Sequence, residues 1–151
     1  MAAGKFKLYE SAKEYLGDNT IDLDSHTFKI ALFSSSSNAN TLSNSTLASL
    51  TNQLSTANGY TSGGITLTNV AWSRVGGSTT FDADNVEWTA SGGTITARYA
   101  VIYDDTAAND ELLGVILLDT TPADVSAPNA YKLQITFSGT GIFNVSGADV
   151  D

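Results

Sequence analysis

The sequence predicts an all-β protein, a single antiparallel β-sandwich preceded by a short N-terminal helix. Between Gly59 and Asp104, short stretches of alternating apolar residues are separated by three Gly-Gly pairs. Glycine pairs at such intervals are typical of tight connections between the strands of a meander. The length of 151 residues suits one domain with its own core. The pairs are Gly63-Gly64, Gly76-Gly77 and Gly92-Gly93.

The N-terminal segment has the spacing of an amphipathic helix over Lys5–Leu16, which Gly17 would end. Its apolar residues are Phe6, Tyr9, Ala12 and Leu16. A helix this short is marginal alone in water, so we expect its apolar stripe to pack on its own sheet or on a partner. We therefore divide the chain into an N-terminal arm, residues 1–25, and a sandwich, residues 26–151.

The strands follow from apolar residues that recur at every second position. Thr94–Tyr103 is apolar on both faces in its second half, which predicts a central strand with Tyr99 and Val101 facing the core. Asp119–Ala130 contains two prolines and is expected to be an irregular crossing connection. This order predicts a sandwich, or a jelly roll if one further strand is present. The expected strands are His26–Phe33, Ile65–Trp72, Thr80–Trp88, Thr94–Tyr103, Leu112–Leu118, Tyr131–Phe137 and Gly141–Val145.

The segment Ser34–Asn58 is the least regular part of the chain and is expected to be a long loop. Leu47, Leu50 and Leu54 stand at i, i+3 and i+7, which predicts a helical turn or two in this region. Loops of this length in compact domains are usually functional or mobile. We therefore expect either a contact with a neighbouring subunit or an ordinary flexible excursion.

The composition disfavours several classes of protein. Only seven Lys and Arg residues stand against sixteen Asp and Glu, so the net charge of −9 does not suit binding to nucleic acid. The absence of cysteine excludes disulfides and thiolate metal sites. No apolar stretch reaches the length of a membrane span or resembles the core of a signal peptide, which predicts a soluble protein used where it is made.

Three lysines, Lys5, Lys7 and Lys13, form the one basic cluster of this acidic chain. They are compatible with a solvated helix face. They are also compatible with an arm that docks on an acidic neighbour.

The chemistry-bearing residues do not form a recognisable catalytic or metal-binding pattern. His26 is the only histidine, and no G-x-S-x-G sequence provides a nucleophile for it. The acids of FDADNVEW, from Asp82 to Glu87, do not match the spacing of a calcium-binding loop. We therefore expect no enzymatic activity, no metal and no cofactor. The aromatic residues Trp72, Trp88, Tyr99 and Tyr103 are expected in the core or an interface, with a sugar site as the alternative.

Several segments together resemble a widespread family of small tailed-bacteriophage virion proteins. They cover most of Phe28–Phe143 and are FKIALF, GYTSGGITLTNV, FDADNVEW, TARYAVIYDD, LLGVILLD and ITFSGTGIF. The resemblance implies a jelly roll or sandwich of the kind that decorates capsids, although some relatives are labelled minor tail or fibre proteins. The family has no catalytic motif that could be carried over to this chain.

The resemblance implies a virion protein, specifically a capsid decoration (cement) protein that binds the outer surface of the assembled head as a homo-oligomer. Its partner would be the major capsid protein, with no nucleic acid or membrane involved, and assembly would occur in the bacterial cytoplasm. The alternatives are a tail, baseplate or fibre component, or a carbohydrate-binding module for host attachment. The residues predicted to bind the partner are Phe6, Tyr9, Lys13, Leu16, Leu47, Leu50 and Leu54.

Overall fold

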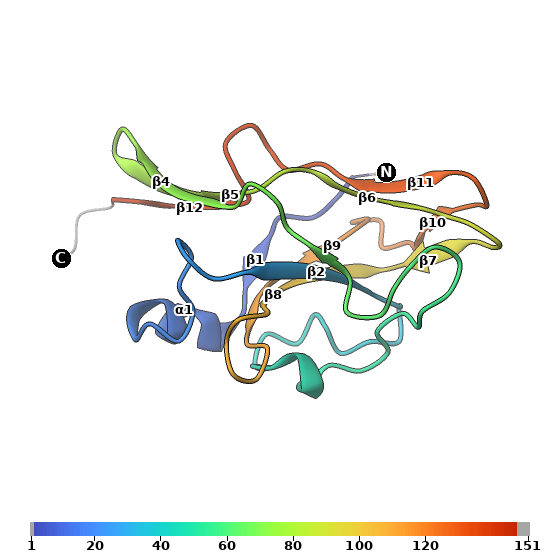
Figure 1. The fold of residues 1–151 in the computed structure, drawn as a ribbon, viewed down its shortest axis with the longest axis horizontal. Helices are drawn as coiled ribbons and strands as arrows, with labels where there is room; N and C mark the ends of the chain where they lie inside the picture. The colour runs from blue at the N-terminus through green and yellow to red at the C-terminus, as the bar shows by residue number, and fades with distance from the viewer. Residues whose placement is uncertain (1, 148–151) are drawn as a thin grey trace.

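The computed structural model describes residues 2–147, whose strands lie in two facing layers, with a helix and a long loop beneath the lower one (Figure 1). Strands account for 39% of the residues and helix for 8%, and every paired strand is antiparallel. The structure thus confirms the predicted all-β sandwich. The jelly-roll form stays a prediction.

The lower layer is a five-stranded sheet of order β1-β9-β8-β2-β3. Its strands are β1 (Lys7–Leu8), β9 (Leu112–Leu117), β8 (Tyr99–Asp104), β2 (Phe28–Phe33) and β3 (Ile65–Thr66). The strands β2, β8 and β9 are buried along almost their whole length, because the upper layer covers one face and the helix and loop cover the other (Figure 1). Coverage on both faces explains their continuous apolar runs. The predicted central strand is confirmed in β8, where Val101 is fully buried and Tyr99 half-buried.

The upper layer consists of one three-stranded sheet and two strand pairs. The three-stranded sheet has the order β12-β5-β4, and the pairs are β11 with β6 and β10 with β7. An edge-to-face contact of Phe28 with Phe81, at 5.2 Å between ring centroids, joins the two layers in the core. The strands are β4 (Ala71–Val75), β5 (Ser78–Asp82), β6 (Val86–Thr89), β7 (Ile95–Ala97), β10 (Val125–Ala127), β11 (Lys132–Ile135) and β12 (Phe143–Ser146).

Three predicted strands are each divided into two in the structure. Ile65–Trp72 is interrupted at Asn69, whose φ of 50° is in the left-handed region. Thr80–Trp88 is interrupted beside Asp84, whose N–H donates to the carbonyl of Thr68. Thr94–Tyr103 changes sheets at Arg98, which separates β7 from β8. Side-chain alternation continues through such breaks, so the pattern of the sequence does not reveal them.

The predicted connection over Asp119–Ala130 is mostly irregular, but it contains the three-residue strand β10. The segment as a whole is thus a connection and not a regular strand, and β10 is an addition to the predicted elements. Strand β10 lies between Pro122 and Pro128. Because both prolines are outside the strand, their lack of a backbone N–H costs no hydrogen bond of the sheet.

The N-terminal helix α1 covers Glu10–Gly17, so the prediction of a helix from Lys5 is wrong over its first half. Lys7 and Leu8 instead extend the lower sheet as β1, paired with Val115 and Gly114 of β9. Glycine at position 114 permits this approach, because a Cβ there would overlap the ring of Phe6. Tyr9, Ala12, Ile21 and Leu23 of the predicted arm belong to the core cluster that also contains residues of the sandwich.

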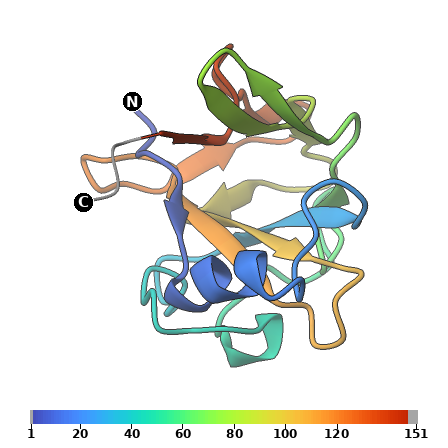
Figure 2. The same ribbon diagram turned by 90° about the vertical axis from the view of Figure 1, so that its left-hand side faces the viewer.

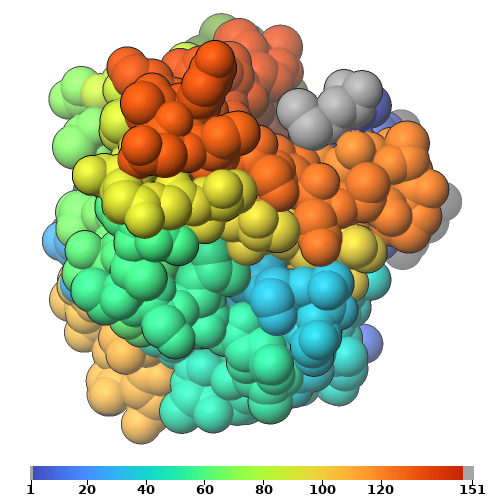
Figure 3. Space-filling model, turned by 90° about the vertical axis from the view of Figure 1, so that its right-hand side faces the viewer, coloured from blue at the N-terminus to red at the C-terminus, as the bar shows by residue number. Residues whose placement is uncertain are grey.

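The segment Ser34–Asn58 is a loop, as predicted, with a single turn of 3-10 helix at Leu47–Ser49. It packs beneath the lower sheet through backbone hydrogen bonds such as Leu54 N–H to the carbonyl of Leu32, at 2.9 Å. In Figure 3 the loop, coloured cyan to green, occupies the lower part of one face beneath residues around 90, in yellow. The side-chain amide of Asn58 donates to the carbonyl of Thr94 at 3.0 Å and joins these two segments.

Replacing Gly64 with alanine is expected to lower the free energy of unfolding by roughly 2–5 kcal/mol. Gly64 has a φ of +82°, and a Cβ at this position would overlap the carbonyl oxygen of Ile30 in β2. Urea denaturation measures the loss. The control is Gly17→Ala, where no atom lies within 4 Å of the new Cβ, and equal stability of the two variants would contradict the prediction.

Candidate interaction surface

The residues predicted to bind a partner mostly pack against the chain itself. Tyr9 is fully buried, and its hydroxyl donates to the carbonyl of Ala39 at 2.6 Å. Tyr9 is therefore not a surface anchor, and its assignment as a partner-binding residue is wrong. Tyr9 directly follows β1, which pairs with β9, and this pairing places the Tyr9 side chain in the core.

The other predicted partner-binding residues differ in exposure. Five apolar side chains are half-buried against the core: Phe6, Leu16, Leu47, Leu50 and Leu54. Lys13 is exposed on α1. The segments of α1 and the loop are adjacent, since the N–H of Glu10 donates to the carbonyl of Leu42 at 2.9 Å. The helix α1 and the loop thus lie together under the lower sheet, where their apolar side chains stabilise the fold.

A different surface is the sheet of β12, β5 and β4, named here the projecting sheet. It extends past the end of the lower sheet in Figure 1 and lies above α1 in Figure 2. Val75 and Val145 on it are 72% and 56% exposed. They lie on opposite faces of the sheet, since Val145 shares the face of Phe143 and Val75 does not. Gly76, with a φ of 62°, forms the turn between β4 and β5 that the Gly-Gly pair predicted.

The inner face of the projecting sheet attaches it to the core through aromatic rings. Phe143 of β12 stacks on Phe6 at 5.6 Å between ring centroids, and it also contacts Trp72 and Phe81. Within residues 2–147, no further strand pairs with the outer edge of β4 or of β12. Unpaired strand edges present rows of backbone donors and acceptors that can pair with another chain.

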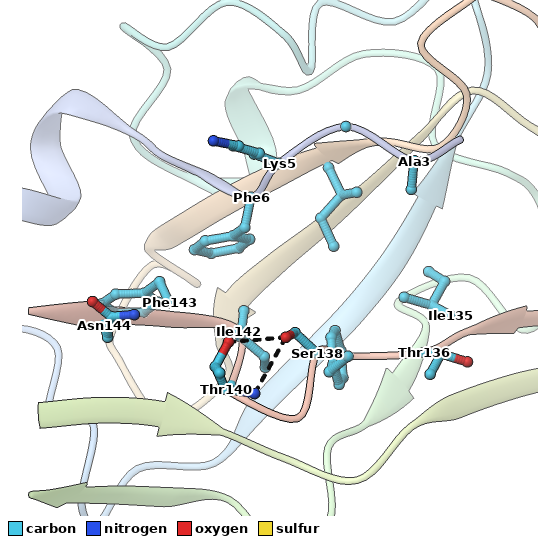
Figure 4. A pocket seen from close by; sticks show the side chains of 14 residues that line it. Ala3, Lys5, Phe6, Ile135, Thr136, Ser138, Thr140, Ile142, Phe143 and Asn144 are labelled. Carbon is cyan, nitrogen blue, oxygen red and sulfur yellow. Dashed lines mark hydrogen bonds between the residues drawn. The ribbon is translucent and has the colours of Figure 1, made fainter. Parts of the chain in front are cut away.

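A groove separates residues 3–6 from residues 135–144 and is named here the edge groove. Its volume is about 610 Å³, and Figure 4 shows Phe6, Ile142 and Phe143 directed toward one another across it. Sequence reasoning missed this groove, because its two walls are more than a hundred residues apart in the chain. The alternating pattern of Tyr131–Phe137 predicted a strand, and the end of this segment forms part of one wall of the groove. The pattern gave no information on the opposite wall.

The single histidine has a structural role. Nδ1 of His26 lies 2.6 Å from Oδ2 of Asp104, whose side chain is fully buried at the end of β8. The other carboxylate oxygen of Asp104 accepts the N–H groups of Thr106 and Ala107, at 2.9 and 3.1 Å. The pair therefore joins the start of β2 to the turn that follows β8.

Replacing His26 with alanine is expected to lower the free energy of unfolding by about 1–3 kcal/mol, because Asp104 would keep a buried carboxylate without its side-chain partner. Urea denaturation measures the change. Ser25→Ala is the control, because Ser25 is exposed and its hydroxyl bonds only to the carboxylate of Asp22. If both variants unfold at the same urea concentration, the His26 contact is not stabilising.

The remaining acids near this pair occupy ordinary structural positions. Burial raises the pKa of Asp110 above its usual range, and the nearby charge of Asp105 adds to the effect. Asp105 itself lies 3.2 Å from Nζ of Lys29. In the described part of the chain, no group of three or more His, Cys, Asp or Glu residues is arranged to hold a metal ion.

Two of the acids of Asp82–Glu87, considered above for calcium, contact neighbouring side chains. Asp84 accepts hydrogen bonds from the hydroxyl of Thr68 and the amide of Asn69, at 3.0 and 2.7 Å. Glu87 lies 2.7 Å from Nζ of Lys132 on the adjacent strand β11. The Glu87 contact joins β6 to β11, and the Asp84 contacts join the turn before β6 to the turn before β4.

Comparison with known proteins finds no family model, no curated protein and no solved structure that matches this chain. Among residues 2–147, no helix has the length and apolar character needed to span a membrane.

Proposed function

We propose that this protein is a bacteriophage virion structural protein, specifically a capsid decoration (cement) protein that binds the outer surface of the assembled head. The observation that carries the proposal is the projecting sheet, with its exposed valines and unpaired strand edges. The resemblance of segments within Phe28–Phe143 to tailed-bacteriophage virion proteins supplies the virion context. The partners would be the major capsid protein and further copies of this chain.

Two features of the projecting sheet support binding. Apolar groups that stay in water, such as Val75 and Val145, stabilise a complex once a partner covers them. The edge of β4 can also pair through its backbone with a neighbouring subunit, as in strand addition.

The net charge of −9 favours protein partners over nucleic acid.

Electron microscopy of purified particles tests the location of the protein. Density for this chain on the outer surface of the head would support the proposal. Density in the tail, baseplate or fibres would overturn the head assignment and favour the alternative virion roles. Absence from the particle would overturn both.

A matched pair of variants tests the surface itself. Val75→Asp, on the projecting sheet, is expected to reduce occupancy on undecorated heads at least roughly tenfold, while the melting temperature stays unchanged. Tyr131→Asp is the control, because its side chain is similarly exposed, at 67% against 72%, but precedes β11 outside the projecting sheet. Full occupancy by Val75→Asp would overturn attachment through the projecting sheet.

A further inference from the structure

The sandwich is open along one side, where each layer ends in an unpaired strand. β1 is the last strand of the lower sheet and β12 the last strand of the projecting sheet, and no described strand pairs with their outer edges. Both edges lie on the same side of the molecule in Figure 2, and the stacked rings of Phe6 and Phe143 join them. The edge groove follows this open side, and a smaller hollow beside Lys7, which shares Gly4 and Lys5 with it, lies next to it.

The edge groove combines an apolar interior with a polar border. Its interior includes Ile116, Ile135, Ile142 and Phe143, and its border includes Thr136, Ser138, Thr140 and Asn144. Figure 4 shows Ala3 and Phe6 on the opposite wall, with Lys5 extending along the border instead of into the groove. This arrangement suits an extended chain whose side chains alternate, one set entering the groove and the other meeting its border.

The charges along the groove have one sign. Among residues 2–147, no carboxylate lines the edge groove or the adjoining hollow, although the chain contains sixteen Asp and Glu residues. The charged side chains that line the two are Lys5 and Lys7. Neither lysine has an ion-pair partner among the described residues, whereas Lys29, Arg98 and Lys132 each contact an acid. Such a border favours an occupant that carries carboxylates.

The backbone of the N-terminal segment also has groups available for pairing. The N–H of Tyr9 donates to the carbonyl of Leu113 at 3.1 Å, and Lys7 is paired with Val115 in the same register. Backbone groups of an antiparallel strand point alternately toward and away from the neighbouring strand. The N–H and C=O groups of Phe6 and Leu8 are therefore directed away from β9, along the free edge.

We propose that the edge groove binds an extended segment of a partner protein, with alternating apolar and acidic side chains, which adds as a strand to the free edge of β1. The apolar side chains enter the groove among Ile116, Ile135 and Ile142, and the carboxylates meet Lys5 and Lys7. This goes beyond the proposed function, because strand addition at β1 does not depend on where in a particle the protein is located.

The test is a titration of the isotopically labelled full-length protein with synthetic peptides, followed by amide chemical shifts. The probe is an eight-residue peptide of alternating valine and aspartate, and the comparison peptides replace aspartate with lysine or serine. At about 1 mM, the aspartate peptide is expected to shift the amides of residues 3–8 and 135–144. The lysine peptide is expected to leave them unchanged, and salt is expected to weaken binding.

Matched lysine variants identify the contact. Lys5→Glu is expected to weaken binding of the aspartate peptide roughly tenfold, whereas Lys13→Glu, an equal charge change on α1 outside the groove, has little effect. Unshifted groove amides, or equal affinity of both variants, would overturn the proposal. Groove shifts that grow with protein concentration alone would also overturn it, because a second copy would then be the occupant. None of these outcomes changes the result of locating the protein by microscopy.

Discussion

Replacing Val101 with aspartate is expected to prevent folding of the protein. Val101 is fully buried in the middle of β8, between Ala31 of β2 and Val115 of β9. Both faces of the sheet are covered there, so the new carboxylate would have neither water nor a partner. Burying an unpaired charge costs at least several kcal/mol, which is comparable to the whole stability of a typical domain.

The yield of soluble protein and its circular dichroism spectrum measure the effect of Val101→Asp. Thr136→Asp is the control, because Thr136 follows β11 with its side chain exposed to water. That variant is expected to change the free energy of unfolding by about 0.5 kcal/mol or less. Equal folding of the two variants would show that the assignment of buried and exposed faces is wrong.

Replacing Tyr9 with alanine is expected to lower the free energy of unfolding by about 3–5 kcal/mol. The ring of Tyr9 is fully buried between α1 and the loop, and its hydroxyl binds the carbonyl of Ala39 at 2.6 Å. Burial raises the pKa of this phenol well above its ordinary value, so the hydroxyl stays a donor at neutral and moderately alkaline pH. Tyr9→Phe keeps the ring and loses the hydrogen bond, so about 1–3 kcal/mol is expected.

Urea denaturation of both Tyr9 variants, with Tyr131→Ala as the control, tests this role. Tyr131 is 67% exposed, and its loss is expected to change the free energy of unfolding by about 0.5 kcal/mol or less. The same contacts predict that deleting residues 1–17 unfolds the sandwich, since the deletion removes β1, Tyr9 and the whole of α1. A truncated protein with the native circular dichroism spectrum would contradict the place of Tyr9 in the core.

The two proposed surfaces use neighbouring parts of the same fold. The projecting sheet offers the exposed edge of β4 and Val75 on its outer face, while the edge groove lies along the other side of β12. The strands β5 and β12 lie between the edge of β4 and the edge groove, and Asn144 of β12 lines the groove. Variants at Val75 and at Lys5 therefore probe the two surfaces separately.

The sequence alone determined the class of fold and the position of most strands. Continuous apolar runs marked β2, β8 and β9, because a strand covered on both faces buries nearly every side chain. Alternating apolar residues marked β11, because a strand covered on one face buries every second side chain. Each predicted Gly-Gly pair contains a glycine with positive φ, which reflects turns that other residues adopt less readily. The leucines around Leu47 likewise marked the single turn of 3-10 helix.

The tertiary structure alone decided where strands change partners and which surfaces remain open. Arg98 lies in an unbroken alternating pattern, yet its backbone binds Phe33 and Leu118 and ends β7. The start of the predicted helix became β1 because Gly114, distant in sequence, leaves room for Phe6. The periodicity of a sequence indicates which side chains lie on the same face of a strand. It does not indicate which neighbouring strand forms backbone hydrogen bonds with that strand. The edge groove lies beside the free edges of β1 and β12, so it forms only when residues 3–6 and residues 135–144 come together in the fold.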